Sequence, residues 1–217
     1  MTRRVAALAS RLVLAASMLC GMGALAAQDT TPPRRATRGC FRGGPADRCA
    51  WFTLTESGVH YRLTDVIPGD ERLLYGFTLG LMANTSGPTA LGGEAFAAVE
   101  GDVRGGIAFR WRRWLGRSSS LDLVAGVHLV GDASSGQVQP GSPMLQASLI
   151  AGDLIGASAR LDVLRLTHSC PDVTCLTRTN RTSERLYVGG EVGSGLGLVA
   201  ALAVGLGVVA FVASYGS

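Results

Sequence analysis

The sequence predicts an all-β protein, an antiparallel up-and-down β-barrel of about eight strands. The first observation behind this prediction is a period of two in the hydrophobicity. From residue 103 the large apolar residues are Val103, Ile107, Phe109 and Trp111, and the positions between them are Arg104, Gly106, Ala108, Arg110 and Arg112. Successive side chains of a strand point to opposite faces, so this pattern is typical of a sheet with one apolar and one polar face.

The second observation is an amino terminus with the features of a secretory signal. Arg3, Arg4 and Arg11 precede an apolar run over residues 12–25, and the triplet at 24–26 is small-x-small. This arrangement predicts a signal peptide over residues 1–26 with cleavage after Ala26. An uncleaved anchor helix is the alternative.

The third observation is the cysteine content. Once Cys20 leaves with the signal, four cysteines remain, Cys40, Cys49, Cys170 and Cys175. Each pair is close in sequence and lies among turn-forming residues, so we expect two local disulfides in an oxidising compartment. A zinc site is the alternative, although neither spacing is that of a usual zinc knuckle.

The segments follow one another in a simple order. Residues 27–49 are rich in proline and arginine without periodicity, and form a flexible lead-in closed by the first disulfide. A barrel domain is expected over residues 50–195. Its predicted strands are 51–63, 72–83, 90–100, 103–115, 121–131, 144–152, 155–167 and 185–193. Strands of this length are sufficient to cross a bilayer at a tilt.

The connections between the strands also carry information. Gly101–Asp102 and Gly152–Asp153 have the composition of tight turns, whereas residues 132–142 and 168–184 are long and polar. In an up-and-down barrel these two long connections leave from the same end. With the amino terminus in the periplasm, that end faces outward.

Alternation alone also fits a soluble barrel or sandwich, so the residue types on the polar face decide between lipid and water. That face mixes glycine and alanine with charges of both signs, as in a narrow lumen. The charged residues are Glu94, Glu100, Arg104, Arg110, Asp122, Arg160, Asp162 and Glu191. Aromatic residues lie near the predicted strand ends, as in interfacial girdles. They are Trp51, Tyr61, Tyr75, Trp111, Trp114 and Tyr187.

Stretches such as Gly105–Trp111 and Leu121–Val127 resemble those of small bacterial outer-membrane β-barrel proteins, and the resemblance spans residues 50–195. It implies an outer-membrane location, membrane lipid as the partner, and a non-enzymatic role that is structural, adhesive or that of a minor pore. The alternative location is the periplasm, with the barrel tethered to the inner membrane. All 20 basic residues are arginines. Three leave with the predicted signal, and many of the rest fall on the polar faces of strands or at strand ends, which is not the clustered basic surface that nucleic-acid binding needs.

The carboxyl end departs from that resemblance. Residues 196–214 are uncharged and have the length of a transmembrane helix. Gly197, Ala201 and Gly205 recur every fourth residue, a spacing that favours close helix packing and hence self-association. The same residues also fit a strand, because four is a multiple of two. Strand parity favours a helix, since eight strands are already assigned and bacterial barrels are even-stranded.

Two histidines are the strongest candidates for chemistry. His60 and His128 fall on the polar faces of their strands, where they could meet Glu94, Glu100 or a serine such as Ser148. A lipid-acting barrel enzyme is therefore an alternative function. Hydrogen-bonded lumen histidines are the favoured interpretation, because no nucleophile elbow or zinc-protease motif is present. We expect no catalytic residue, no metal and no cofactor.

Overall fold

The computed structural model describes residues 39–41, 43–45, 49–64, 71–85, 87–116, 119–133, 136–152, 154–168 and 179–193. The predicted signal peptide, the second cysteine pair and the apolar segment 196–214 lie outside these residues. In the part of the chain that is described, no helix is long and apolar enough to cross a bilayer.

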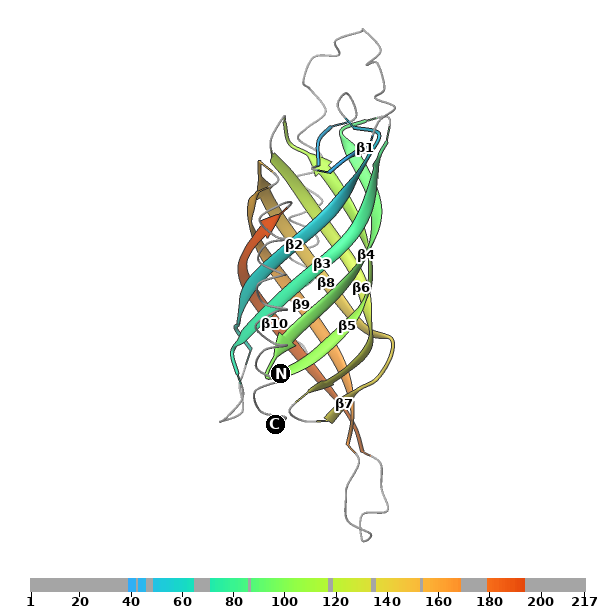
Figure 1. Cartoon of the computed structure of the whole chain (residues 1–217). Helices are drawn as coiled ribbons and strands as arrows, with labels where there is room; N and C mark the ends of the chain where they lie inside the picture. The colour runs from blue at the N-terminus through green and yellow to red at the C-terminus, as the bar shows by residue number, and fades with distance from the viewer. Residues whose placement is uncertain are drawn as a thin grey trace, which may run out of the picture. The chain divides into compact units, whose positions relative to one another are not determined.

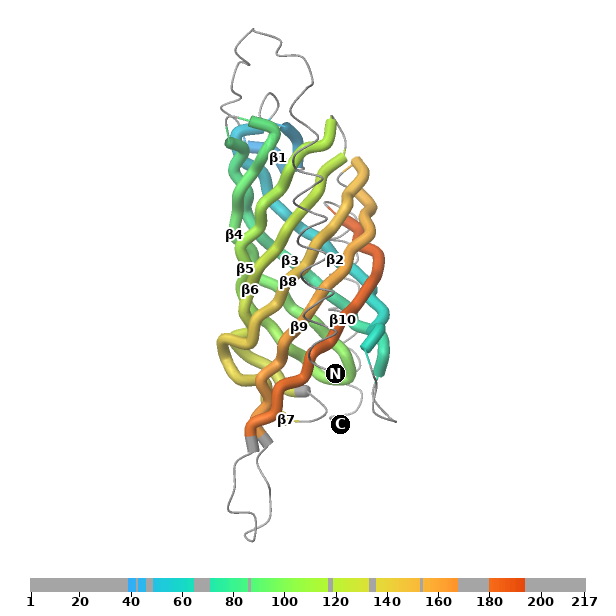
Figure 2. Tube along the Cα trace, turned by 180° about the vertical axis from the view of Figure 1, so that it is seen from behind, coloured from blue at the N-terminus to red at the C-terminus, as the bar shows by residue number. Residues whose placement is uncertain are grey.

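Eight long strands form a closed antiparallel barrel (Figures 1 and 2), which confirms the predicted fold class. They are β2 (Trp51–Arg62), β3 (Leu73–Asn84), β4 (Thr89–Glu100), β5 (Asp102–Trp114), β6 (Ser119–Ala133), β8 (Ser142–Ala151), β9 (Ile155–His168) and β10 (Thr179–Gly193). Each strand pairs with the next along the chain, and β10 pairs with β2 to close the barrel. Closure satisfies the backbone groups that an open sheet leaves at its edges.

The predicted strand limits hold within two residues except at two places. β10 begins at residue 179, six residues before its predicted start, and pairs with β9 from His168↔Thr179 onward. Residues 179–184 are polar on both faces, so no alternation marks them as a strand. The short strand β7 (Gly136–Val138) also lies within the predicted connection 132–142, where it pairs with β6 and β9.

The alternation of β6 breaks near its end. The pairing of β5 with β6 shifts register between Gly105 and Gly106, which leaves Leu129 without an opposite residue. Leu129 and Val130 are both exposed as a result, at 42% and 67%. Such a bulge moves every later side chain of the strand to the other face.

The two ends of the barrel differ in their connections. At the disulfide end, where β2 begins and β5 ends, the turns are short and span residues 85–88, 115–118 and 152–154. At the loop end, where β2 and β4 end, the connections 63–72, 134–141 and 169–178 are longer. Gly101 alone joins β4 to β5 there, with a φ of +71° that glycine adopts without strain.

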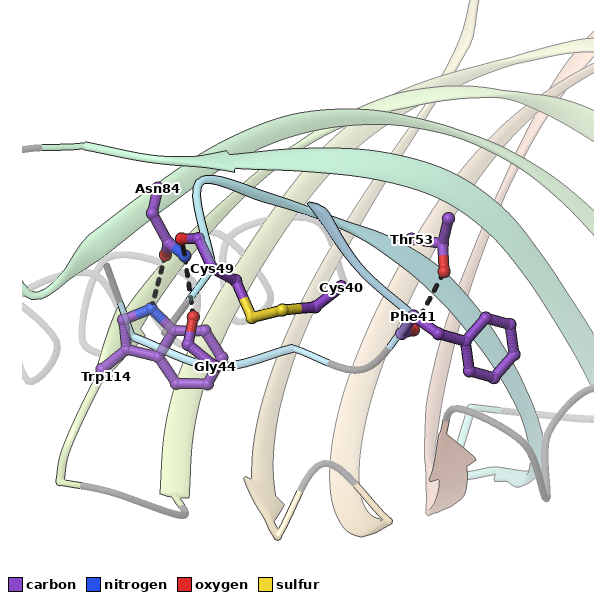
Figure 3. The surroundings of a disulfide bond; sticks show 7 residues. All are labelled: Cys40, Phe41, Gly44, Cys49, Thr53, Asn84 and Trp114. Carbon is purple, nitrogen blue, oxygen red and sulfur yellow. Dashed lines mark hydrogen bonds between the residues drawn. A yellow bond between two sulfur atoms is a disulfide. The ribbon is translucent and has the colours of Figure 1, made fainter. Parts of the chain in front are cut away.

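A short segment held by a disulfide packs against the start of β2. β10 stops opposite Glu56, so the first residues of β2 have a free edge, and β1 (Gly39–Cys40) pairs with it in parallel. Cys40 and Cys49 form the predicted disulfide, which excludes a zinc site at this pair. The Asn84 amide donates to the carbonyls of Gly44 and Cys49 at 2.7 Å each (Figure 3).

Loss of this disulfide should lower the free energy of unfolding by about 2–3 kcal/mol, because an open chain gains the entropy of a loop of this length. We expect the Cys40→Ser/Cys49→Ser variant to unfold at a lower urea concentration than the wild type. The same measurement on Cys170→Ser/Cys175→Ser tests the second predicted disulfide. An unchanged midpoint for the first variant would show that Asn84 and β1 hold the segment without the cross-link.

Candidate functional site in the barrel lumen

The inward positions of the strands place charged side chains in the lumen. Every charged residue that the sequence assigned to the polar face is buried there, at 7% exposure or less. The buried arginines are Arg62, Arg104, Arg110, Arg112, Arg160 and Arg185, and the buried carboxylates are Glu56, Glu94, Glu100, Asp122, Asp162 and Glu191. Among the described residues the lumen therefore holds equal numbers of both signs.

The outer wall has the opposite composition. Large apolar side chains along the middle of the strands are exposed, among them Leu79 at 54%, Ile107 at 53%, Phe109 at 54%, Leu145 at 54% and Leu149 at 58%. Trp51, Tyr61 and Tyr75 are about half exposed, as expected of aromatic residues near strand ends. The barrel thus has its polar residues inside and its apolar residues outside.

Two of the predicted girdle aromatics point inward instead. Trp114 is 7% exposed and Tyr187 is fully buried. Both occupy lumen positions of the alternation and use their polar atoms there: Trp114 Nε1 donates to Asn84 Oδ1 at 2.9 Å, and the Tyr187 hydroxyl donates to Glu100 at 2.7 Å. Proximity to a strand end was therefore a weaker guide than the face of the strand.

A first ion-pair cluster lies toward the disulfide end. Arg110 contacts three carboxylates, Glu56 at 2.7 Å, Glu94 at 2.6 Å and Asp122 at 2.8 Å. Arg112 donates to both oxygens of Asp122, at 2.8 Å and 2.7 Å. Four strands, β2, β4, β5 and β6, supply these five residues, so the cluster ties opposite parts of the wall together.

An apolar layer lies beside this cluster at the same end. Phe52, Leu54, Met82, Ala90 and Trp114 form a buried group against which Cys40 packs. The Arg112 guanidinium lies over the rings of Phe52 and Trp114, at 5.5 Å and 5.2 Å from their centroids. Cation–π contacts of this kind are strongest where water is excluded. This layer and the disulfide segment therefore pack against each other at the disulfide end of the barrel.

A second cluster lies toward the loop end and is centred on Glu100. Arg104 and Arg185 reach the same oxygen of Glu100 at 3.1 Å and 2.7 Å, and Arg62 reaches the other oxygen at 3.5 Å. Arg104 also contacts Asp162 at 3.2 Å. Three guanidinium groups thus surround one carboxylate.

The Asp162 part of this cluster extends it toward the middle of the barrel. Arg160 donates to Asp162 at 2.9 Å, and His128 Nε2 lies 3.5 Å from the same oxygen. The His128 ring packs edge-on against Phe96, with centroids 5.2 Å apart. His128 therefore has Asp162 as its carboxylate neighbour, while Glu94 and Glu100, the expected ones, are engaged by arginines.

His60 lies in a separate polar group. Its Nε2 is 2.7 Å from Ser158 Oγ and 3.6 Å from Glu191, whose carboxylate also accepts from the Gln146 amide at 2.5 Å. A serine hydrolase needs its carboxylate on the imidazole nitrogen that faces away from the serine. Here serine and carboxylate share one nitrogen, so the group has the geometry of a hydrogen-bonded lumen histidine.

Sequence reasoning missed Ser158, Gln146 and Glu56 as partners. Each occupies an inward position, and that signal was present, but which inward residues meet depends on the register around the closed barrel. No group of three metal-ligating side chains occurs in the described ranges. The described lumen residues thus form three polar groups that cross-link the wall, and none of these groups has a nucleophile, base and acid in catalytic order.

Comparison with known proteins gives no assignment: no protein-family model, no curated protein and no solved structure matches this chain.

Proposed function

We propose that this chain is a non-enzymatic outer-membrane β-barrel protein with a closed lumen, in a structural or adhesive role. The observation that carries the proposal is the inverted distribution of side chains. Exposing leucine, isoleucine and phenylalanine to water forfeits roughly 25 cal/mol per Å² of apolar surface. A bilayer removes that cost, because its hydrocarbon core is as apolar as the side chains.

The connections support an orientation. Outer-membrane barrels have short turns on the periplasmic side and longer loops on the outer side. By this rule the disulfide end faces the periplasm, where disulfides persist, and the loop end faces outward. The strands, at 10 to 15 residues, reach or exceed the length that a tilted crossing needs.

The closed lumen favours a scaffold over a pore. An eight-stranded barrel has an interior just wide enough for its own side chains. Here ion pairs and an apolar layer occupy it, and the lumen-facing charges are 7% exposed or less. In this proposal the membrane holds the wall, the ion pairs keep the barrel rigid, and the loop end presents the longer connections to the outside.

Membrane fractionation tests the location. We expect both the full-length protein and a version ending at Gly193 to be in the outer membrane, and to migrate faster on cold electrophoresis when unheated. The truncated version separates the barrel from the apolar segment 196–214. If full-length protein is found in the inner membrane and the truncated form is soluble in the periplasm, the chain is a tethered periplasmic domain and the proposal is wrong.

A further inference from the structure

The charge of the lumen is balanced as a whole but divided unevenly along the barrel. The loop-end cluster contains four arginines and two carboxylates, namely Arg62, Arg104, Arg160 and Arg185 with Glu100 and Asp162. The rest of the lumen contains Arg110 and Arg112 with Glu56, Glu94, Asp122 and Glu191. Among the described residues the loop-end cluster therefore holds an excess of guanidinium groups over carboxylates.

Burial makes this excess costly. An arginine in a low-dielectric lumen is stabilised only by charges and acceptors close to it, and a carboxylate at the other end of the barrel contributes little. Three guanidinium nitrogens in the cluster have no hydrogen-bond acceptor in the described part of the chain. They are Arg104 Nε, Arg160 Nη2 and Arg185 Nε, on three different strands. The side chains that carry them are 0–5% exposed.

The cluster lies near the mouth of the barrel. Arg62 is the last residue of β2 and Glu100 is the last residue of β4. The connection after Glu100 is Gly101 alone. A small ligand beside Arg62, Glu100 and Arg104 therefore lies within two residues of the ends of β2, β4 and β5, on the side that the proposed orientation turns outward.

We propose that the loop-end cluster binds a phosphate- or sulfate-type oxyanion. Guanidinium groups present planar pairs of donors that match tetrahedral oxyanions, and charge-assisted bonds of this kind are the strongest hydrogen bonds in proteins. Glu100 already occupies part of the cluster, and Tyr187, Asp162 and His128 complete its surroundings. The site does not depend on where the barrel resides.

Titration of the folded full-length protein with inorganic phosphate, followed by calorimetry in detergent at low salt, tests the proposal. We expect saturable binding of one phosphate per chain. Arg185→Gln should weaken it at least tenfold. Arg165→Gln is the matched control, because Arg165 is exposed on the outer wall near the same end. A soluble short-chain phosphatidic acid forms a second arm: competition with phosphate identifies a lipid headgroup as a source of the anion.

A second variant keeps the test valid even where Arg185→Gln fails to fold. Glu100→Gln removes the carboxylate that competes for the same arginines, so phosphate should bind at least tenfold more tightly. Cold electrophoresis verifies that each variant is a folded barrel. The proposal is overturned by the absence of saturable binding to the wild type, by equal losses in Arg185→Gln and Arg165→Gln, or by weaker binding to Glu100→Gln.

Discussion

Replacement of Arg110 by methionine should destabilise the barrel by about 3–5 kcal/mol, the cost of removing one partner from a buried ion pair. Glu56, Glu94 and Asp122 all lie within 2.8 Å of this guanidinium. Without it, Glu56 and Asp122 share Arg112, and Glu94 loses the guanidinium group that it contacts. Urea unfolding of the barrel in lipid vesicles measures the change.

Arg113→Met is the matched control. Arg113 lies three residues after Arg110 in the same strand, and its side chain is on the opposite face. A surface change of this kind is expected to alter stability by no more than about 0.5 kcal/mol. Adding Glu94→Gln to Arg110→Met should recover part of the loss, because it removes one uncompensated charge. Equal effects of Arg110→Met and Arg113→Met would show that the cluster does not hold the wall together.

The sequence was sufficient for the faces of the strands. Alternation assigned Arg104, Arg110 and Asp162 to the polar face, and each is buried in the lumen. Glycine at residue 101 predicted a tight turn, and its φ of +71° accounts for that choice. These features are local, because the direction of a side chain follows from the backbone of its own strand.

The contacts inside the lumen required the closed barrel. His60 meets Ser158, 98 residues away, because β2 pairs with β10 and β10 with β9. No spacing along the chain carries that information. The bulge at Gly105 and Gly106 is invisible for the same reason, since it is a property of the pairing between β5 and β6.

The start of β10 illustrates a further limit. Residues 179–184 form a strand although both faces of this segment are polar. Their backbone pairs with that of β9, beyond the end of the barrel wall. Alternation reports on one buried face, so it cannot detect a strand that has none. The prediction that Trp114 and Tyr187 lie in an interfacial girdle was wrong, because both occupy inward positions of their strands and are buried in the lumen.

Introduction of arginine at Phe109 should cost roughly 2–4 kcal/mol if the outer wall meets lipid, as for cations near the midplane of a bilayer. Phe109 lies well inside β5, whereas Leu115 follows the end of that strand. The two side chains are almost equally exposed, at 54% and 56%. Leu115→Arg is therefore a control matched in exposure and placed at the end of the strand, and we expect it to cost about 0–1 kcal/mol.

Equal exposure makes the comparison decisive. In water, arginine at either position replaces an apolar surface residue, and both variants should unfold at nearly the wild-type urea concentration. In a bilayer, only Phe109→Arg moves a charge into hydrocarbon, while Leu115→Arg places it at the polar interface. If unfolding from vesicles shows a loss of stability for Phe109→Arg alone, the result supports an outer wall that contacts lipid. If both variants change the free energy of unfolding by small and equal amounts, the outer face of this barrel contacts water or another protein, and the proposed outer-membrane location is wrong.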